Sequence, residues 1–169
     1  MTRGRKNASP PRRITMERVF DAPVEDVWAL WTTKEGIESW WGPDGFSVKV
    51  HAIDLRVAGE LRYAMIATAP DKVEFMKRAG MPISNDALVR YSEIVENRLL
   101  RYVNHADFVP GVEPYDVETV VELHSTPKGV RMVLTFEAMH DAHWTKMAVM
   151  GWESQLDRLG KVLANRRTP

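Results

Sequence analysis

The sequence predicts an α+β fold in which a curved antiparallel sheet of about six to seven strands wraps around one long C-terminal helix. Two observations carry this prediction. Apolar residues recur at three- and four-residue steps through residues 144–166, as they do along a helix with one broad apolar face. Between Phe46 and Glu137 the apolar residues instead tend to alternate with polar ones, as in strands with one buried face. The long helix is the element that can cover that face.

Two short helices are expected before the sheet continues. Residues 12–20 alternate as an amphipathic first strand, and Asp21 is placed to cap the helix that follows. Thr32 and Glu35 have the three-residue spacing of a capping box, which predicts a second helix that ends before Gly42. The chain is therefore expected to begin as strand, helix, helix.

The remaining strands are predicted from alternation and are separated by turn residues. Residues 70–82 interrupt the pattern, and Asp71 is placed to cap a short inserted helix there. Residues 105–115 are expected to form a loop because they contain two prolines and a glycine, and Asp141 is the expected cap of the long helix. The predicted strands are residues 46–54, 60–65, 88–96, 98–104, 117–123 and 130–137.

The composition indicates one soluble domain. The chain has 169 residues, of which 44% are hydrophobic, and this is enough for a single core. Residues 1–12 are expected to be a disordered basic tail, and residues 13–167 are expected to form the domain. The absence of cysteine excludes disulfides and thiolate zinc sites, and no apolar run is long enough to span a membrane. We therefore expect a cytoplasmic protein.

The charges and motifs give no reason to expect a nucleic acid, a metal or a cofactor. Lys and Arg together number 23, as do Asp and Glu, so the chain has no net charge that would attract a polyanion. His140 and His143 are three residues apart, but no third ligand stands at a recognisable spacing. The sequence also lacks a phosphate-binding loop, a dinucleotide fingerprint and a nucleophile elbow.

A strongly curved sheet wrapped on a helix often leaves a cavity between them, and we expect a ligand to bind there. Trp28 and Trp31 are interpreted as core residues, because aromatic side chains at helical spacing usually supply buried area. Trp40 and Trp41 are adjacent, so we expect one of them at the pocket rim rather than both inside. The residues predicted to line the pocket are Trp40, Trp41, Tyr63, Met76, Met81, Tyr91, Tyr102, His105, Phe108, Trp144, Met147 and Met150.

Three side chains are candidates for proton transfer, although no catalytic residue is assigned. Tyr91 and Glu93 are two residues apart on a predicted strand and are therefore expected to share one face. If that face is inward, they would supply the polar anchors of an apolar pocket. His105 and Asp107 are expected to form either an acid/base pair or a solvated pair in a loop.

Several short segments occur in an order and spacing typical of one known family. They are Phe20–Pro23, Val27-Trp28, Trp31-Thr32, Trp40–Pro43, Tyr91–Val95, Gly151-Trp152 and Leu156–Leu159. Over residues 14–165 the chain thereby resembles the AHSA1-like family, which is named for activators of the Hsp90 ATPase and belongs to the START-like or SRPBCC superfamily. The resemblance implies the helix-grip fold, as in Bet v1-like proteins, with an internal pocket for hydrophobic or amphipathic small molecules. Compared with many relatives, residues 71–87 form a long insertion, which implies a remodelled pocket mouth.

Three functions are compatible with these observations. The first is binding of a small hydrophobic or amphipathic ligand in the internal cavity. The second is an enzyme of the polyketide cyclase-like type, which requires two of Tyr91, Glu93 and His105 to converge inside the cavity. The third is a module associated with an Hsp90-type chaperone, which requires an exposed apolar patch; the match is to the C-terminal-type domain of the eukaryotic co-chaperone. A monomer or a homodimer is expected in each case.

Overall fold

The computed structural model describes residues 12–106 and 111–166, and most of the basic tail lies outside them. Within this part of the chain the structure has seven strands and four helices. In order they are β1 (Arg13–Phe20), α1 (Val24–Thr32), α2 (Lys34–Trp40), β2 (Phe46–Ile53), β3 (Glu60–Ala67), α3 (Pro70–Arg78), β4 (Ser84–Val95), β5 (Leu99–Ala106), β6 (Tyr115–Thr126), β7 (Gly129–Glu137) and α4 (Ala142–Arg166). Among the described residues, none of the helices is long and apolar enough to cross a membrane.

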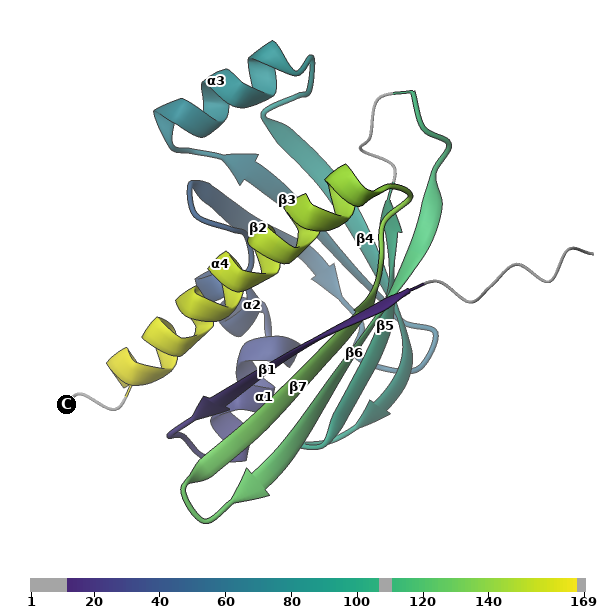
Figure 1. Ribbon diagram of the computed structural model, residues 1–169. Helices are drawn as coiled ribbons and strands as arrows, with labels where there is room; N and C mark the ends of the chain where they lie inside the picture. Colours follow the sequence, from purple (N-terminus) through teal and green to yellow (C-terminus); the bar gives the residue numbers. More distant parts are fainter. Residues whose placement is uncertain (1–11, 107–110, 167–169) are drawn as a thin grey trace, which may run out of the picture.

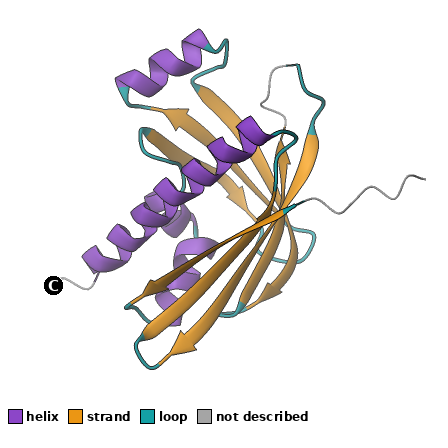
Figure 2. Cartoon of the chain, in the orientation of Figure 1, coloured by secondary structure: helices purple, strands orange, loops and turns teal. Residues whose placement is uncertain are grey.

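The strands form one antiparallel sheet in the order β1-β7-β6-β5-β4-β3-β2. The sheet is strongly curved, and α4 lies across its open side (Figure 1). Both α1 and α2 contact α4 and the sheet, whereas α3 is set apart at one end (Figure 2). The predicted fold class, a curved antiparallel sheet covered by one long C-terminal helix, is confirmed.

The long helix α4 is deeply buried along only half of its length. Leu156, Leu159 and Leu163 are buried, whereas none of residues 144–152 is, in a helix that the structure describes completely. Met150 in this first half is 60% exposed. The C-terminal half therefore anchors the helix on the core, and the N-terminal half lies more loosely over the sheet.

The starts of α1 and α2 differ from the predicted ones by one or two residues. The residue that precedes α1 is Pro23, whose fixed φ suits a helix start, and Asp21 is not the cap. The cap of α2 is Thr33 rather than Thr32, and its hydroxyl accepts a hydrogen bond of 3.0 Å from the Gly36 N–H. Spacing alone does not distinguish two adjacent threonines.

Of the other two predicted helix caps, the one of α3 is wrong and the one of α4 is correct. Ala69 precedes α3, which begins at Pro70, so Asp71 lies within the first turn and the prediction that it caps the helix is wrong. The negative charge of Asp71 still interacts favourably with the positive, N-terminal end of the dipole of α3. Asp141 caps α4 as predicted, because its Oδ1 accepts a hydrogen bond of 2.8 Å from the Trp144 N–H.

Candidate ligand-binding site

An aromatic cluster lies between α1, α2, α4 and the concave face of the sheet. Its centre is Trp41, whose ring centroid is 5.2 Å from that of Tyr63 on β3 and 6.2 Å from that of Tyr102 on β5. Trp31 on α1 is also 6.2 Å from Trp41. Trp152 on α4 stacks on Trp31, with centroids 6.1 Å apart and an interplanar angle of 30°. The cluster therefore joins α1, α2 and α4 to two central strands.

The floor of this cluster is a row of side chains that crosses four neighbouring strands. Tyr91 on β4 is paired with Tyr102 on β5, which is paired with Thr119 on β6, which is paired with Phe136 on β7. Directly opposed residues point to the same face of a sheet, so these side chains share the concave face. Asn104, one step along β5 on that face, donates to the Thr119 hydroxyl at 3.4 Å. The floor thus mixes aromatic surface with hydroxyl and amide groups.

Three buried polar atoms in the cluster have no hydrogen-bond partner among the described residues. They are the indole Nε1 of Trp31, the indole Nε1 of Trp41 and the hydroxyl of Tyr91. These side chains are only 1%, 4% and 2% exposed. By contrast, the Nε1 of the neighbouring Trp40 donates to the Leu30 carbonyl at 2.7 Å. A buried donor without an acceptor costs about 1–3 kcal/mol, so three in one place indicate a site for an additional acceptor.

The tyrosines of the cluster stay protonated at neutral pH. Burial raises the pKa of Tyr63 to about 12. Burial, and to a lesser degree the nearby Tyr63, raises the pKa of Tyr91 above its usual range, and burial likewise raises the pKa of Tyr102. Among the described residues the buried polar side chains outside the aromatic set are Thr32 and Thr119, and neither carries a charge. The site therefore offers neutral hydrogen-bonding groups in an apolar surrounding.

Both Trp40 and Trp41 are buried, with 0% and 4% exposure, so the expectation that one of them lies at the rim is wrong. The reason is the end of α2. Trp40 is its last helical residue, whereas Trp41 has φ −65° and ψ 142°, which is extended backbone. Because the chain leaves the helix between the two residues, their side chains do not follow helical spacing. Trp40 packs as a core residue, and Trp41 faces the tyrosines.

Tyr91 and Glu93 lie on opposite sides of the sheet, so the prediction that they share a face is wrong. In β4 the pairing with β5 shifts between them, since Tyr91 is opposite Tyr102 and Glu93 is opposite Arg101. Ser92 is the extra residue of this bulge, and it breaks the alternation of faces. Tyr91 stays inside, whereas the Glu93 carboxylate is exposed and pairs with Arg101 at 3.2 Å.

His105 is also outside the cluster. It belongs to β5, which continues to Ala106, so the predicted loop is shorter than expected. Its Nδ1 lies 3.0 Å from Oδ1 of Asp116, the residue opposite it on β6, and its side chain is 45% exposed. Asp107 and Phe108, which were predicted to accompany it, lie outside the described residues. Of the three candidates for proton transfer, the interior therefore contains only Tyr91.

The predicted methionines and Trp144 at the start of α4 are not part of the aromatic cluster. Met76 on α3 is buried and Met81 half-buried, but neither belongs to the main core. Trp144 and Met147 are half-buried, and Met150 is exposed, so Met150 does not line the site.

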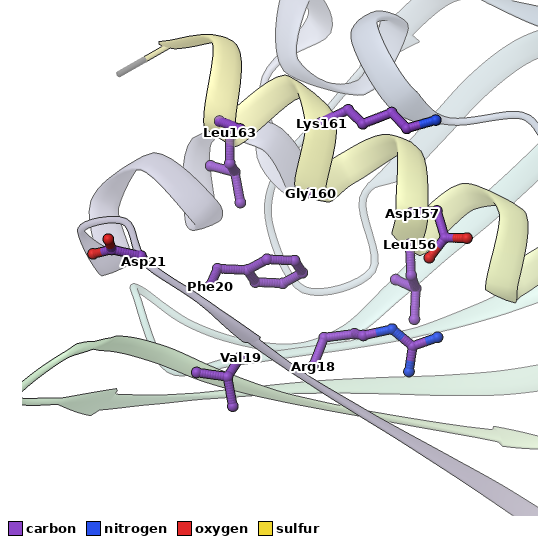
Figure 3. Close-up of a pocket in the computed structure, with 10 residues that line it drawn as sticks. Arg18, Val19, Phe20, Asp21, Leu156, Asp157, Gly160, Lys161 and Leu163 are labelled. Atoms are coloured by element: carbon purple, nitrogen blue, oxygen red, sulfur yellow. The ribbon is translucent and has the colours of Figure 1, made fainter. Parts of the chain in front are cut away.

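Open grooves lie between β1 and α4, away from the aromatic cluster. One groove of about 890 Å³ runs between the end of β1 and the C-terminal half of α4 (Figure 3). Its floor is Phe20, which packs beneath Gly160, and Arg18, Asp157 and Lys161 also line it. The sequence patterns did not indicate this groove. It carries charges of both signs and, among the described residues, no buried polar atom without a partner, so the aromatic cluster is the stronger candidate for the site.

The sequence of residues 21–164 matches the model of the family described as Activator of Hsp90 ATPase homolog 1-like protein, over well more than half of the chain. The chain belongs to this family. The AHSA1-like family predicted from the short segments is thereby confirmed. A comparison with functionally curated proteins gave no match.

Solved structures show the same fold as this AHSA1-like protein. A protein from Chromobacterium violaceum is similar at 25% identity with a TM-score of 0.74, over 90% of this chain and 98% of that one. A protein from Nitrosomonas europaea is similar at 19% identity and a TM-score of 0.73, over 96% and 100% of the two chains. An AHSA1-like protein from Aeromonas hydrophila is similar at 19% identity and a TM-score of 0.68, over 92% and 94%.

Proposed function

We propose that this AHSA1-like protein binds a small hydrophobic or amphipathic molecule between the concave face of its sheet and α4. The observation that supports the proposal is the closed aromatic cluster around Trp41, which contains three buried polar atoms without partners among the described residues. Binding sites for small molecules combine such apolar walls with a few convergent polar groups.

The first half of α4 is the part of the structure that can admit a ligand. The aromatic side chains of the floor are at most 7% exposed, so a molecule from solvent has to displace a covering element. Residues 144–152 are at most half-buried, whereas Leu156, Leu159 and Leu163 hold the second half of the helix. Moving the first half would therefore separate partly buried side chains such as Ala148 and Val149 from the core, but none of the fully buried leucines of the helix. Trp152, which stacks on Trp31, would form the movable wall.

The other two hypotheses lack a supporting observation. A cyclase-like mechanism requires two of its three candidate groups inside the site, and Glu93 and His105 are on the outer face. A chaperone-binding module requires an exposed apolar patch, but the most exposed large apolar residues are dispersed over different segments. They include Val19 on β1, Val57 before β3, Phe75 on α3 and Met150 on α4. A cytoplasmic monomer or homodimer remains part of the proposal, in keeping with the lack of cysteine.

Native mass spectrometry and tryptophan fluorescence, measured against lipids, aromatic hydrocarbons and polyketide-like compounds, test the proposal. We expect a complex with one ligand per chain and a change in tryptophan emission, because four of the six tryptophans belong to or border the cluster. Competition between two ligands would place them in the same site. If no compound class forms a complex at saturating concentration, the proposed function is wrong.

A further inference from the structure

We propose that the ligand of the aromatic cluster is uncharged and carries an oxygen that only accepts hydrogen bonds, such as a ketone carbonyl, held by Trp31, Trp41 and Tyr91. This inference names the chemistry of the ligand and rests on the proposed function. Two observations support it. The unpartnered polar groups of the cluster are hydrogen-bond donors, and no charged side chain among the described residues is buried near them.

The unpartnered groups are hydrogen-bond donors. An indole N–H donates and has no acceptor atom, so Trp31 and Trp41 can be satisfied only by an acceptor. The hydroxyl of Tyr91 is protonated and can donate as well. A ligand N–H group at this position would leave donors facing donors. A ligand O–H group could accept from the indoles, but it would bring a further donor that needs an acceptor of its own. An oxygen with two lone pairs complements them.

These donors belong to one connected group. The rings of Trp31 and Trp41 are 6.2 Å apart and nearly perpendicular, at 77°. Trp41 is also 6.2 Å from Tyr102, which is directly opposite Tyr91 in the sheet. Tyr91 also interacts electrostatically with Tyr63, whose ring contacts Trp41. The three side chains therefore belong to one contiguous set that is contributed by α1, by the end of α2 and by β4.

The surroundings favour a neutral ligand. Among the described residues no Lys, Arg, Asp or Glu is buried, and the charges of β4 and β5, such as Glu93 and Arg101, pair on the outer face. A carboxylate or an ammonium group in the cluster would be desolvated without a counter-charge, which is costly. A carbonyl oxygen needs only the donors that are present.

The flat rings around the donors favour a planar body. Trp41 is perpendicular to Tyr63, at 90°, and Trp152 stacks on Trp31 at 30°. Such surfaces form stacked or edge-to-face contacts with another ring.

Ordered water would satisfy the same donors in the ligand-free protein. Detecting binding alone therefore does not test the role of the donors, and related ligands have to be compared.

The test uses three compounds that share one planar skeleton. Fluorene has a methylene group at the position where fluorenone has a carbonyl, and fluorene-9-carboxylic acid adds a negative charge. We expect fluorenone to bind about tenfold more tightly than fluorene, and the carboxylate to bind more weakly than either. Equal affinities for fluorene and fluorenone would overturn the inference and leave the proposed function intact. Tightest binding of the carboxylate would overturn the requirement for a neutral ligand, and binding of none of the three would count against both proposals.

Two variants assign the effect to the cluster. Tyr91→Phe removes one donor and keeps the ring, so it should reduce the preference for fluorenone over fluorene several-fold. Tyr115→Phe is the matched control, because the Tyr115 hydroxyl lies 2.8 Å from His140 Nδ1, outside the cluster. It should leave the preference for fluorenone over fluorene unchanged, even if the lost contact before α4 changes both affinities together. An unchanged preference in Tyr91→Phe would remove Tyr91 from the site.

The indole groups can be observed without substitution. In an ¹⁵N–¹H spectrum, fluorenone should shift the indole resonances of Trp31 and Trp41 downfield, as a new acceptor does. The resonance of Trp40 should remain in place, because its N–H is already bound to the Leu30 carbonyl. Shifts of equal size for all three would mean a general conformational change and would overturn the assignment of the donors.

Discussion

At the scale of single residues, the adjacent side chains of Trp40 and Trp41 differ in their hydrogen bonding. The indole of Trp40 joins α2 to α1 through the Leu30 carbonyl, at 2.7 Å. The indole of Trp41 contacts the aromatic rings of β3 and β5 and has no acceptor among the described residues. The first residue stabilises the fold, and the second is one of the donors of the proposed site.

Replacing the two tryptophans by phenylalanine should therefore have unequal effects on stability. Trp40→Phe removes a hydrogen bond and leaves a buried carbonyl unpaired, so we expect the free energy of unfolding to fall by about 2–4 kcal/mol. Trp41→Phe removes no hydrogen bond within the protein and should cost less. Urea unfolding monitored by circular dichroism measures both. Equal losses would contradict the division of tasks.

The buried tyrosines predict how stability depends on alkaline pH. The ordinary pKa of a tyrosine is 10.0, and burial raises that of Tyr63 to about 12. Between these values the unfolded chain binds fewer protons than the folded one, so stability is fully present below pH 10 and falls as the pH rises towards 12. Denaturant unfolding at a series of pH values measures the slope. The slope should be smaller in Tyr63→Phe, and an unchanged slope would contradict the prediction.

Tyr63, Tyr91 and Tyr102, which were predicted to line the pocket, are buried, whereas Glu93 was assigned to the wrong face. One extra residue in β4 reverses the faces, and no turn residue marks it in the sequence. Thr119 and Asn104 were not predicted as part of the site, because the strand pattern does not show which inward polar residues lie opposite an aromatic side chain. Cross-strand register provides that information, and it is a property of the folded sheet.

At the scale of elements, the two halves of α4 differ. The second half is fixed to the core by buried leucines, and the first half covers the concave face with side chains that are at most half-buried. Leu159 is 0% exposed in the second half, and Leu159→Ala should lower the free energy of unfolding by about 2–5 kcal/mol, because it opens a cavity in the core. Denaturant unfolding tests this value. A loss below about 1 kcal/mol would mean that the second half does not anchor the helix.

The first half of α4 should affect binding more than folding. Met147 is half-buried there, so Met147→Ala should weaken ligand binding while the unfolding midpoint changes little. Met150→Ala is a suitable control on the same helix, because Met150 is 60% exposed. Ligand titration and thermal unfolding of both variants distinguish the cases. If Met147→Ala mainly lowers the unfolding midpoint, the first half of α4 belongs to the core and the prediction is wrong.

Hydrogen bonds from α4 also hold the loop that follows Trp41. Arg158 Nη1 donates to the carbonyls of Gly42 and Phe46 at 3.1 and 3.0 Å, and Ser154 accepts from the Asp44 N–H at 2.8 Å. Hydrogen bonds to a charged group contribute about 1.5–3 kcal/mol. The loop is therefore fixed to the second half of the helix.

Arg158→Met should remove this contribution and lower the unfolding free energy by about 1.5–3 kcal/mol. Arg158→Lys should recover part of it, since an ammonium group can donate to both carbonyls. The matched control is Arg131→Met, which removes the same charge from an exposed pair with Glu17 on the sheet and should cost less than about 1 kcal/mol. Similar losses in the two methionine variants would contradict a special role for Arg158.

Whole elements were easier to predict than their ends. The long apolar stripe of α4 and the alternation of the strands correspond to real elements, because both arise from burial on one face. Helix starts depend on which of two neighbouring residues leaves the helical conformation, as with Thr32 and Thr33, and the sequence contains both possibilities.

At the scale of the whole molecule, charge and apolar surface are separated by the sheet. Arg101 on the convex face pairs with Glu93 and Glu118, and Glu118 also pairs with Arg13, so one row of ions from four strands spans the sheet from β4 to β1. The concave face carries the aromatic floor. The overall arrangement followed from the alternation in the sequence, whereas the convergence of residues from α1, α2, β3, β4 and β5 on one cluster required the three-dimensional fold.

The position of Trp31 has an optical consequence. Its ring is 4.6 Å from Trp40, 6.2 Å from Trp41 and 6.1 Å from Trp152, so four indoles form one set of coupled chromophores. Coupled transitions of this kind give a strong near-ultraviolet circular dichroism signal whose size depends on the mutual orientation of the rings. A molecule that separates Trp152 from Trp31 would reduce this signal while the backbone signal stays constant. The four indoles would thus report spectroscopically on the proposed movement of α4.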